Sequence, residues 1–170
     1  MSGETKAKNR FAIFRGADAP FLGDTGAMPL PPIQNASLPE FNRAVASGLG
    51  DGEEVRLVFA RPGFSLTRVW FKKDFPLPLH SHDADCLYYI TAGSIRLGNQ
   101  TLTKGDGFFL PADMPYTYRA GPEGVELLEF RTAEKFDFRF HSDTPEFWTK
   151  AADICAENQA GWKTAPVPRE

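Results

Sequence analysis

The chain has 170 residues, which is enough for one domain with a sizeable core. Its formal net charge is −3 and it carries no long basic run, so we expect no nucleic-acid partner. Two cysteines make no disulfide framework, no apolar stretch reaches the ~18 residues of a membrane span, and no signal peptide is visible, so we expect a cytoplasmic protein without a membrane partner.

The N-terminal part is predicted to be an arm that ends in a short helix. A short strand is predicted at residues 11–14, and residues 16–36 are rich in Gly and Pro, which is typical of an irregular extended segment. Ser37 and Glu40 have the spacing of a capping box, so a helix is predicted to begin there. Gly48 is expected to end this helix.

The middle of the chain is predicted to be a series of short strands separated by turns. The predicted strands are 55–60, 64–73, 86–92, 94–97, 100–103, 107–110, 116–120 and 125–132, with one more at 136–140. Gly, Pro, Asn and Asp lie in the breaks between them. This regular alternation of short strands and turns, together with an aromatic content of 13%, predicts an all-β domain built as an antiparallel sandwich or barrel.

A second helix is predicted near the C-terminus. Thr144 is a suitable N-cap, Pro145 fits the first helical position, and Glu146 places an acid in the first turn. Gly161 is expected to end this helix. The expected organisation is an N-terminal arm and helix at 1–50, a barrel at 51–141, and a C-terminal helix and tail at 142–170.

The segment from Pro78 to His82 gives the strongest indication of chemistry. Two of the three histidines of the chain, His80 and His82, lie here two residues apart. Alternate side chains of a β-strand point to the same face, so both imidazoles are aimed at one place, as a metal site needs. The same alternation predicts that Cys86 and Tyr88 face the interior from the next strand.

These residues and their spacing resemble the first motif of the cupin superfamily. That motif runs Gly, five residues, His-x-His, three or four residues, Glu, six residues, Gly. The corresponding residues here are Asp74, His80, His82, Cys86 and Gly93. The spacing therefore fits throughout, whereas Asp74 replaces a Gly and Cys86 replaces the Glu.

The second cupin motif, Gly, five residues, Pro-x-Gly, two residues, His, three residues, Asn, is matched in part. Gly105 and Pro111 agree with it, and Asp113, Tyr116 and Ala120 replace its second Gly, its His and its Asn. The resemblance covers roughly residues 55–132. It implies a double-stranded β-helix, that is, an antiparallel barrel or jelly roll, with short helical segments at both ends. It also implies a pocket in the barrel mouth and a homodimer.

In the usual cupin metal site, two His and the Glu of the first motif join the His of the second. The resemblance maps these four ligands onto His80, His82, Cys86 and Tyr116. A divalent transition metal, Fe, Zn, Ni or Mn, is therefore the expected cofactor. In the alternative interpretation, the histidines line a metal-free pocket, Cys86 is a small buried hydrophobe and Tyr116 is a wall or hydrogen-bond donor.

Two functions remain open from the sequence, and they leave undecided whether the chain is an enzyme. One is a metal-dependent dioxygenase, lyase or isomerase acting on a small organic molecule, with Tyr116 and Tyr88 as catalytic groups. The other is a metal-free cupin that binds or senses a small molecule without catalysis. In both, the predicted lining of the substrate pocket is Trp70, Arg68, Phe109 and Tyr118.

Overall fold

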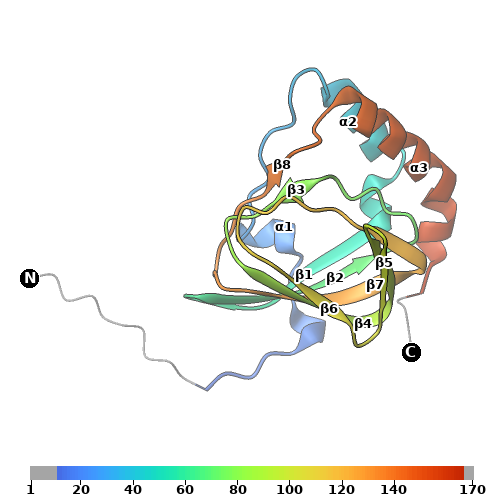
Figure 1. The fold of residues 1–170 in the computed structure, drawn as a ribbon. Coiled ribbons are helices and arrows are strands. Elements are labelled where there is room, and N and C mark those ends of the chain that lie inside the picture. The colour runs from blue at the N-terminus through green and yellow to red at the C-terminus, as the bar shows by residue number, and fades with distance from the viewer. Residues whose placement is uncertain (1–10, 167–170) are drawn as a thin grey trace, which may run out of the picture.

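Antiparallel strands enclose the main core of the molecule, which a computed structural model describes for residues 11–166 (Figure 1). The larger sheet has the strand order β1-β2-β7-β4-β5, and β6 also pairs with β4. Its strands are β1 (Glu53–Arg61), β2 (Phe64–Phe71), β4 (Cys86–Leu97), β5 (Gln100–Thr103), β6 (Gly107–Leu110) and β7 (Arg119–Arg131). A second, two-stranded sheet pairs β3 (His80–Ser81) with β8 (Arg139–Phe140).

The strands form because inward residues alternate with outward ones. In β4, Cys86, Tyr88 and Ile90 are buried, whereas the side chains of Leu87 and Tyr89 between them are about half exposed. The same alternation holds in β2 and over the second half of β7. The inward residues make one apolar core, so the predicted all-β barrel is confirmed.

Two helices, α2 (Leu38–Ala46) and α3 (Pro145–Thr164), lie over one end of the barrel (Figure 1). The chain also has a short helix, α1 (Leu22–Thr25), and two 3-10 turns, η1 (Gly16–Asp18) and η2 (Leu49–Gly52). The rings of Phe41 in α2 and Trp148 in α3 meet edge to face at 4.8 Å. Cys155 and Trp162 of α3 reach into the barrel core. No helix of the part described here has both the length and the apolar character needed to cross a membrane.

The N-terminal arm lies against the barrel and is held there by backbone hydrogen bonds. Leu57 N of β1 donates to Pro20 O at 3.0 Å, and Phe136 N donates to Ala27 O at 2.9 Å. Leu22 and Ala27 are buried in a small apolar cluster with Phe136. The arm therefore joins β1 to the segment that precedes β8.

Several predicted elements differ from those in the structure. The strands predicted at 86–92 and 94–97 are one strand, β4, and those at 116–120 and 125–132 are largely one strand, β7. Gly93 (φ +72°) and Gly124 (φ +77°) absorb a register shift without ending the strands, because only glycine adopts this conformation at low cost. A Cβ on Gly93 would lie 2.2 Å from the Gly124 carbonyl oxygen.

The bounds of three other predicted elements also differ from those in the structure. Residues 11–14 form no strand, and the strand predicted at 136–140 is limited to Arg139–Phe140. Gly161 does not end α3, which continues to Thr164 because Trp162 is buried and its Nε1 donates to Lys73 O at 2.8 Å.

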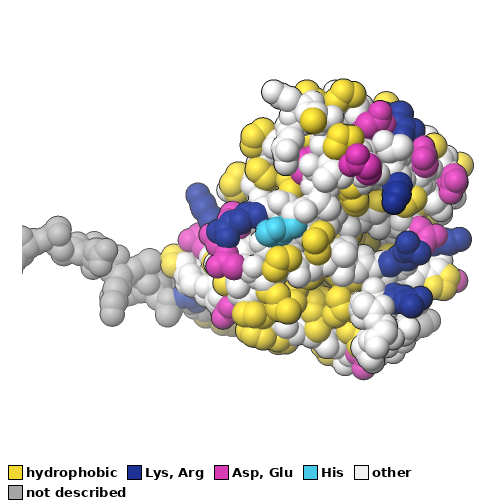
Figure 2. Space-filling view, turned by 45° about the horizontal axis from the view of Figure 1, so that its top comes forward, with side chains coloured by type: hydrophobic (Ala, Val, Ile, Leu, Met, Phe, Trp, Pro, Cys, Tyr) yellow, Lys and Arg dark blue, Asp and Glu magenta, His cyan; other side chains and the backbone are white. Residues whose placement is uncertain are grey.

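Figure 2 shows one face of the surface, on which hydrophobic side chains gather on the lower part and charges of both signs are spread over the rest.

Candidate functional site

The two histidines of the motif lie side by side at the start of the barrel interior. His80 belongs to β3, and its backbone exchanges two hydrogen bonds with Tyr116, N to O at 3.0 Å and O to N at 2.8 Å. This pairing places the ring of Tyr116 4.3 Å from that of His80. Phe138 stacks on the other side of His80, with ring centroids 4.5 Å apart. The His80 and His82 rings are 5.0 Å apart.

Both imidazoles are oriented by backbone carbonyls. His80 Nδ1 lies 2.7 Å from Pro78 O, and His82 Nδ1 lies 2.6 Å from Asp137 O. A carbonyl oxygen only accepts hydrogen bonds, so Nδ1 of each ring carries the proton and Nε2 has a free lone pair. Asp137 is itself fixed, because its backbone N–H and carboxylate exchange hydrogen bonds with those of Asp83.

Burial keeps these histidines neutral. Their exposed fractions are 3% for His80 and 6% for His82. Burial lowers the pKa of His80 to about 3. Burial also lowers the pKa of His82, and the charge of Arg131 lowers it further. At neutral pH both rings therefore present an uncharged acceptor to the interior.

Two tyrosines extend this arrangement into the core. The hydroxyls of Tyr88 and Tyr116 lie 2.5 Å apart, and Tyr116 Oη lies 3.3 Å from His82 Nε2. Because His82 Nε2 has no proton, Tyr116 donates to it, and Tyr88 in turn donates to Tyr116. Burial raises the pKa of both phenols, so both hydroxyls keep their protons.

A buried ion pair faces the histidines from β7. Arg131 Nη1 donates to Glu129 Oε2 at 2.6 Å and to Thr67 Oγ1 at 3.1 Å, and Thr67 Oγ1 donates to Glu129 at 2.8 Å. Arg131 is 2% exposed. Its Nη2 lies 3.5 Å from His82 Nε2. A permanent positive charge thus stands next to the Nε2 lone pair of His82, which also accepts from Tyr116.

These groups surround a cavity of about 80 Å³ inside the barrel. Its polar lining consists of His80, His82, Tyr116, Tyr118, Glu129, Arg131 and Glu53. Its apolar lining consists of Leu22, Met28, Val55, Val69, Phe71, Leu77 and Phe138. Leu22 and Met28 belong to the N-terminal arm, so the arm forms part of the cavity wall. Glu53 is exposed and therefore marks the mouth.

The cavity collects some of the residues predicted from the sequence. His80, His82, Tyr116 and Tyr118 line it. Tyr88 lies behind Tyr116 and reaches the cavity only through that hydroxyl. Cys86 is buried on β4, and its Sγ lies 3.9 Å from Leu87 O. Burial raises the pKa of this thiol to about 12.

Three predicted pocket residues lie elsewhere. Arg68 and Trp70 alternate along β2 with inward Thr67, Val69 and Phe71, so they face outward. Arg68 pairs there with a glutamate of β1 at 3.2 Å. Phe109 points outward from β6 and is 58% exposed. Successive side chains of a strand point to opposite faces of the sheet, and this alternation places all three residues outside the cavity.

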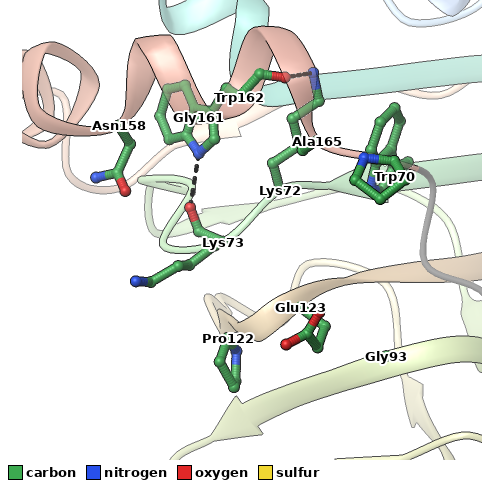
Figure 3. A pocket seen from close by; sticks show the side chains of 11 residues that line it. Trp70, Lys72, Lys73, Gly93, Pro122, Glu123, Asn158, Gly161, Trp162 and Ala165 are labelled. Carbon is green, nitrogen blue, oxygen red and sulfur yellow. Dashed lines mark hydrogen bonds between the residues drawn. The ribbon is translucent and has the colours of Figure 1, made fainter.

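Trp70 instead lines a surface cleft of about 430 Å³ between α3 and the sheet (Figure 3). Lys72 Nζ lies 4.6 Å from the Trp70 ring centroid and donates to Trp162 O at 2.6 Å. Trp162 Nε1 donates to Lys73 O. These contacts attach α3 to the barrel.

The sequence analysis assigned no role to Arg131 or Glu129. A signal for both was present in the alternation of β7. Val125 and Leu127 are inward and aliphatic, and the next inward positions are Glu129 and Arg131. Two opposite charges at inward positions of a barrel strand require partners, which is a mark of a functional site.

Of the four expected metal ligands, two fit a divalent ion and two do not. His80 and His82 are neutral and anchored through Nδ1, as metal-binding histidines are. Cys86 does not line the cavity, the Tyr116 hydroxyl is bonded to Tyr88 and His82, and Arg131 places a cation at His82 Nε2. Within residues 11–166, no three His, Cys, Asp or Glu side chains converge to hold an ion. The complete donor set therefore does not fit a metal.

The topology and the motif identify the fold. An antiparallel barrel carries the His-x-His pair at its interior, and the Tyr of the second motif pairs directly with the first His. The described chain has a cupin-like fold. The predicted fold is thus confirmed, whereas Cys86 and Tyr116 stand at two of the four ligand positions that the resemblance implies.

Comparisons with known proteins found similar solved structures at low sequence identity. No family model matches the sequence, and no curated protein matches it. Similar solved structures include an RmlC-like cupin from Shewanella frigidimarina, at 22% identity over 49% of this chain and 78% of that one, with a TM-score of 0.45. The polyketide cyclase RemF from Streptomyces resistomycificus is 18% identical over 59% of this chain and 84% of its own, with a TM-score of 0.49. An oxalate decarboxylase variant from Bacillus subtilis is 20% identical over 49% of this chain and only 26% of its own, with a TM-score of 0.44.

Proposed function

We propose that this chain binds a small organic molecule in the barrel cavity, in direct contact with His80, His82 and Tyr116 and with no metal ion between them. The observation that supports this most directly is the 3.5 Å approach of Arg131 Nη2 to His82 Nε2. A metal ligand must offer its lone pair to the ion, whereas this lone pair faces a guanidinium and a tyrosine hydroxyl. The cavity has a mouth at Glu53, is mainly apolar and carries a few polar groups, as small-molecule sites do.

The chemistry of the lining determines which ligands are suited to it. Neutral His80 can accept a hydrogen bond through Nε2, and Arg131 can donate, whereas the His82 Nε2 lone pair and the protons of Tyr88 and Tyr116 are used among themselves. Every one of these groups is held by a second contact, so the site is preorganised and loses little entropy on binding. A ligand with both an acceptor and a donor group would match it.

A metal ion held by His80 and His82 with water is the second candidate. It is favoured by one specific observation, the anchoring of both Nδ1 atoms by backbone carbonyls, which directs both Nε2 lone pairs inward. Such an ion would act as a Lewis acid or would activate oxygen, as the dioxygenase, lyase and isomerase alternatives require.

Elemental mass spectrometry separates the two candidates. Untagged wild-type protein is incubated with Fe²⁺, Zn²⁺, Ni²⁺ or Mn²⁺, desalted and compared with the His80→Ala, His82→Ala double variant. His141→Ala, which removes the exposed histidine outside the cavity, is the matched control. We expect wild type and both variants to retain the same low metal content. A nearly stoichiometric ion in wild type and the control, lost from the double variant, would overturn the metal-free proposal.

A further inference from the structure

One buried hydrogen-bond donor in the cavity wall has no partner. Arg131 Nε is inaccessible to solvent and makes no hydrogen bond among the described residues. The Nη1 group is occupied by Glu129 and Thr67, and Nη2 has only the long 3.5 Å contact with His82. An unpaired buried donor is costly, so such groups occur where a ligand or water completes them.

The free donors share one edge of the guanidinium. Nε–H and one N–H of Nη2 point in the same direction and form the fork that a planar, two-oxygen anion fits. The ring of Phe136 lies 4.1 Å from the guanidinium carbon and covers its face, so the edge is the part that remains available. Glu129 occupies a different edge and does not compete for these two donors.

We propose that the ligand of the cavity, on the function proposed above, is a small monocarboxylate whose two oxygens accept hydrogen bonds from Nε and Nη2 of Arg131. The volume limits its size: a cavity of about 80 Å³ is roughly half the ~150 Å³ that holds benzene, so the ligand has about three to five non-hydrogen atoms. Glu129 inside and Glu53 at the mouth oppose a second carboxylate.

A further feature of the ligand follows from His80. Its Nδ1 is used by Pro78 O, and its Nε2 has no hydrogen-bond partner among the described residues. A hydroxyl on the ligand can donate to this nitrogen while the carboxylate lies on Arg131. A small hydroxy acid such as glycolate, with five non-hydrogen atoms, uses both groups and is expected to bind more tightly than acetate.

Isothermal titration of the full chain tests the carboxylate. Acetate and acetamide have the same shape and differ in charge, so their comparison isolates the ionic contribution. For molecules this small the best dissociation constants lie at about 10⁻⁵–10⁻⁴ M, so titration extends to millimolar ligand at constant ionic strength. We expect wild type to bind acetate at least ~10-fold more tightly than acetamide.

Two variants attribute the effect to the Arg131 fork. Arg131→Lys keeps a positive charge beside Glu129 but loses Nε and the fork, so acetate binding is expected to weaken at least ~10-fold. Arg139→Lys makes the same change on an exposed arginine of β8 and should bind like wild type. Circular dichroism and urea unfolding verify that each variant is folded.

The possible outcomes separate this inference from the function on which it rests. Equal binding of acetate and acetamide by wild type, or full acetate binding by Arg131→Lys, would overturn the carboxylate assignment. If neutral molecules such as acetamide still bind and lose affinity in His80→Ala, the proposed function holds and only its ligand class is wrong. If neither acetate, glycolate nor acetamide binds, both proposals are overturned.

Discussion

Lowering the pH should destabilise this protein through His80, and the size of the effect follows from burial. The pKa of His80 is lowered to about 3 in the folded chain, against about 6.5 for an exposed histidine. On acidification the unfolded chain therefore binds the proton first. The contribution of neutral His80 to stability is fully present above pH 6.5 and is lost as the pH falls towards 3.

The magnitude can be worked out for an accessible pH range. With pKa values of 6.5 unfolded and about 3 folded, His80 alone removes about 2 kcal/mol of unfolding free energy between pH 7 and pH 5. Its complete protonation penalty approaches ~5 kcal/mol below pH 3. His82 acts in the same direction, because burial lowers its pKa too.

Urea unfolding at pH 7, 6 and 5 in the presence of a chelator measures this effect. We expect His80→Gln to lose about 2 kcal/mol less stability than wild type between pH 7 and pH 5, which is about 1 M in urea midpoint. Identical pH dependence in wild type and His80→Gln would refute the idea that burial holds His80 neutral.

Three further changes test the packing around the site by urea unfolding. Arg131→Leu and Glu129→Leu should each lower the free energy of unfolding by about 3–5 kcal/mol, because each leaves a buried charge unpaired. The double variant should lose much less, and losses that simply add would contradict this reasoning. Thr144→Ala should cost about 1 kcal/mol, because the Thr144 hydroxyl oxygen caps α3, and no loss would show that the cap is unimportant. Gly93→Ala should lower the free energy of unfolding clearly more than Gly98→Ala. Both positions have a positive φ, but only at Gly93 would a Cβ meet a carbonyl oxygen, at 2.2 Å. Equal losses in the two variants would refute the steric argument.

The fold was predictable because its determinants are local. Alternation of apolar and polar residues and the recurrence of turn residues indicate short antiparallel strands without knowledge of their partners. The start of α3 followed from Thr144 and Pro145, since capping depends on adjacent residues. The end of α3 did not, because Trp162 is held by contacts with the barrel that lie far away in the sequence.

The site was predictable only where a motif marked it. His80 and His82 stand out because their spacing has a chemical meaning within one short segment. Arg131 is distant in sequence, and its approach to His82 depends on the pairing of β7 with β4 and β2. Trp70 was placed in the pocket because of its ring, although its position in the alternation of β2 points it outward. Side-chain direction was therefore a better guide than residue type.

The residues at the expected ligand positions differ in charge from those that the resemblance implies. Cys86 stands where the resemblance leads one to expect a carboxylate, and its direct cross-strand neighbour on β7 is Arg131. Losing an acidic ligand removes the negative charge that would favour a metal ion. A guanidinium then occupies the region beside His82, with Glu129 as its counter-ion. The place beside His82 Nε2 is thus taken by an arginine of the chain, paired with Glu129.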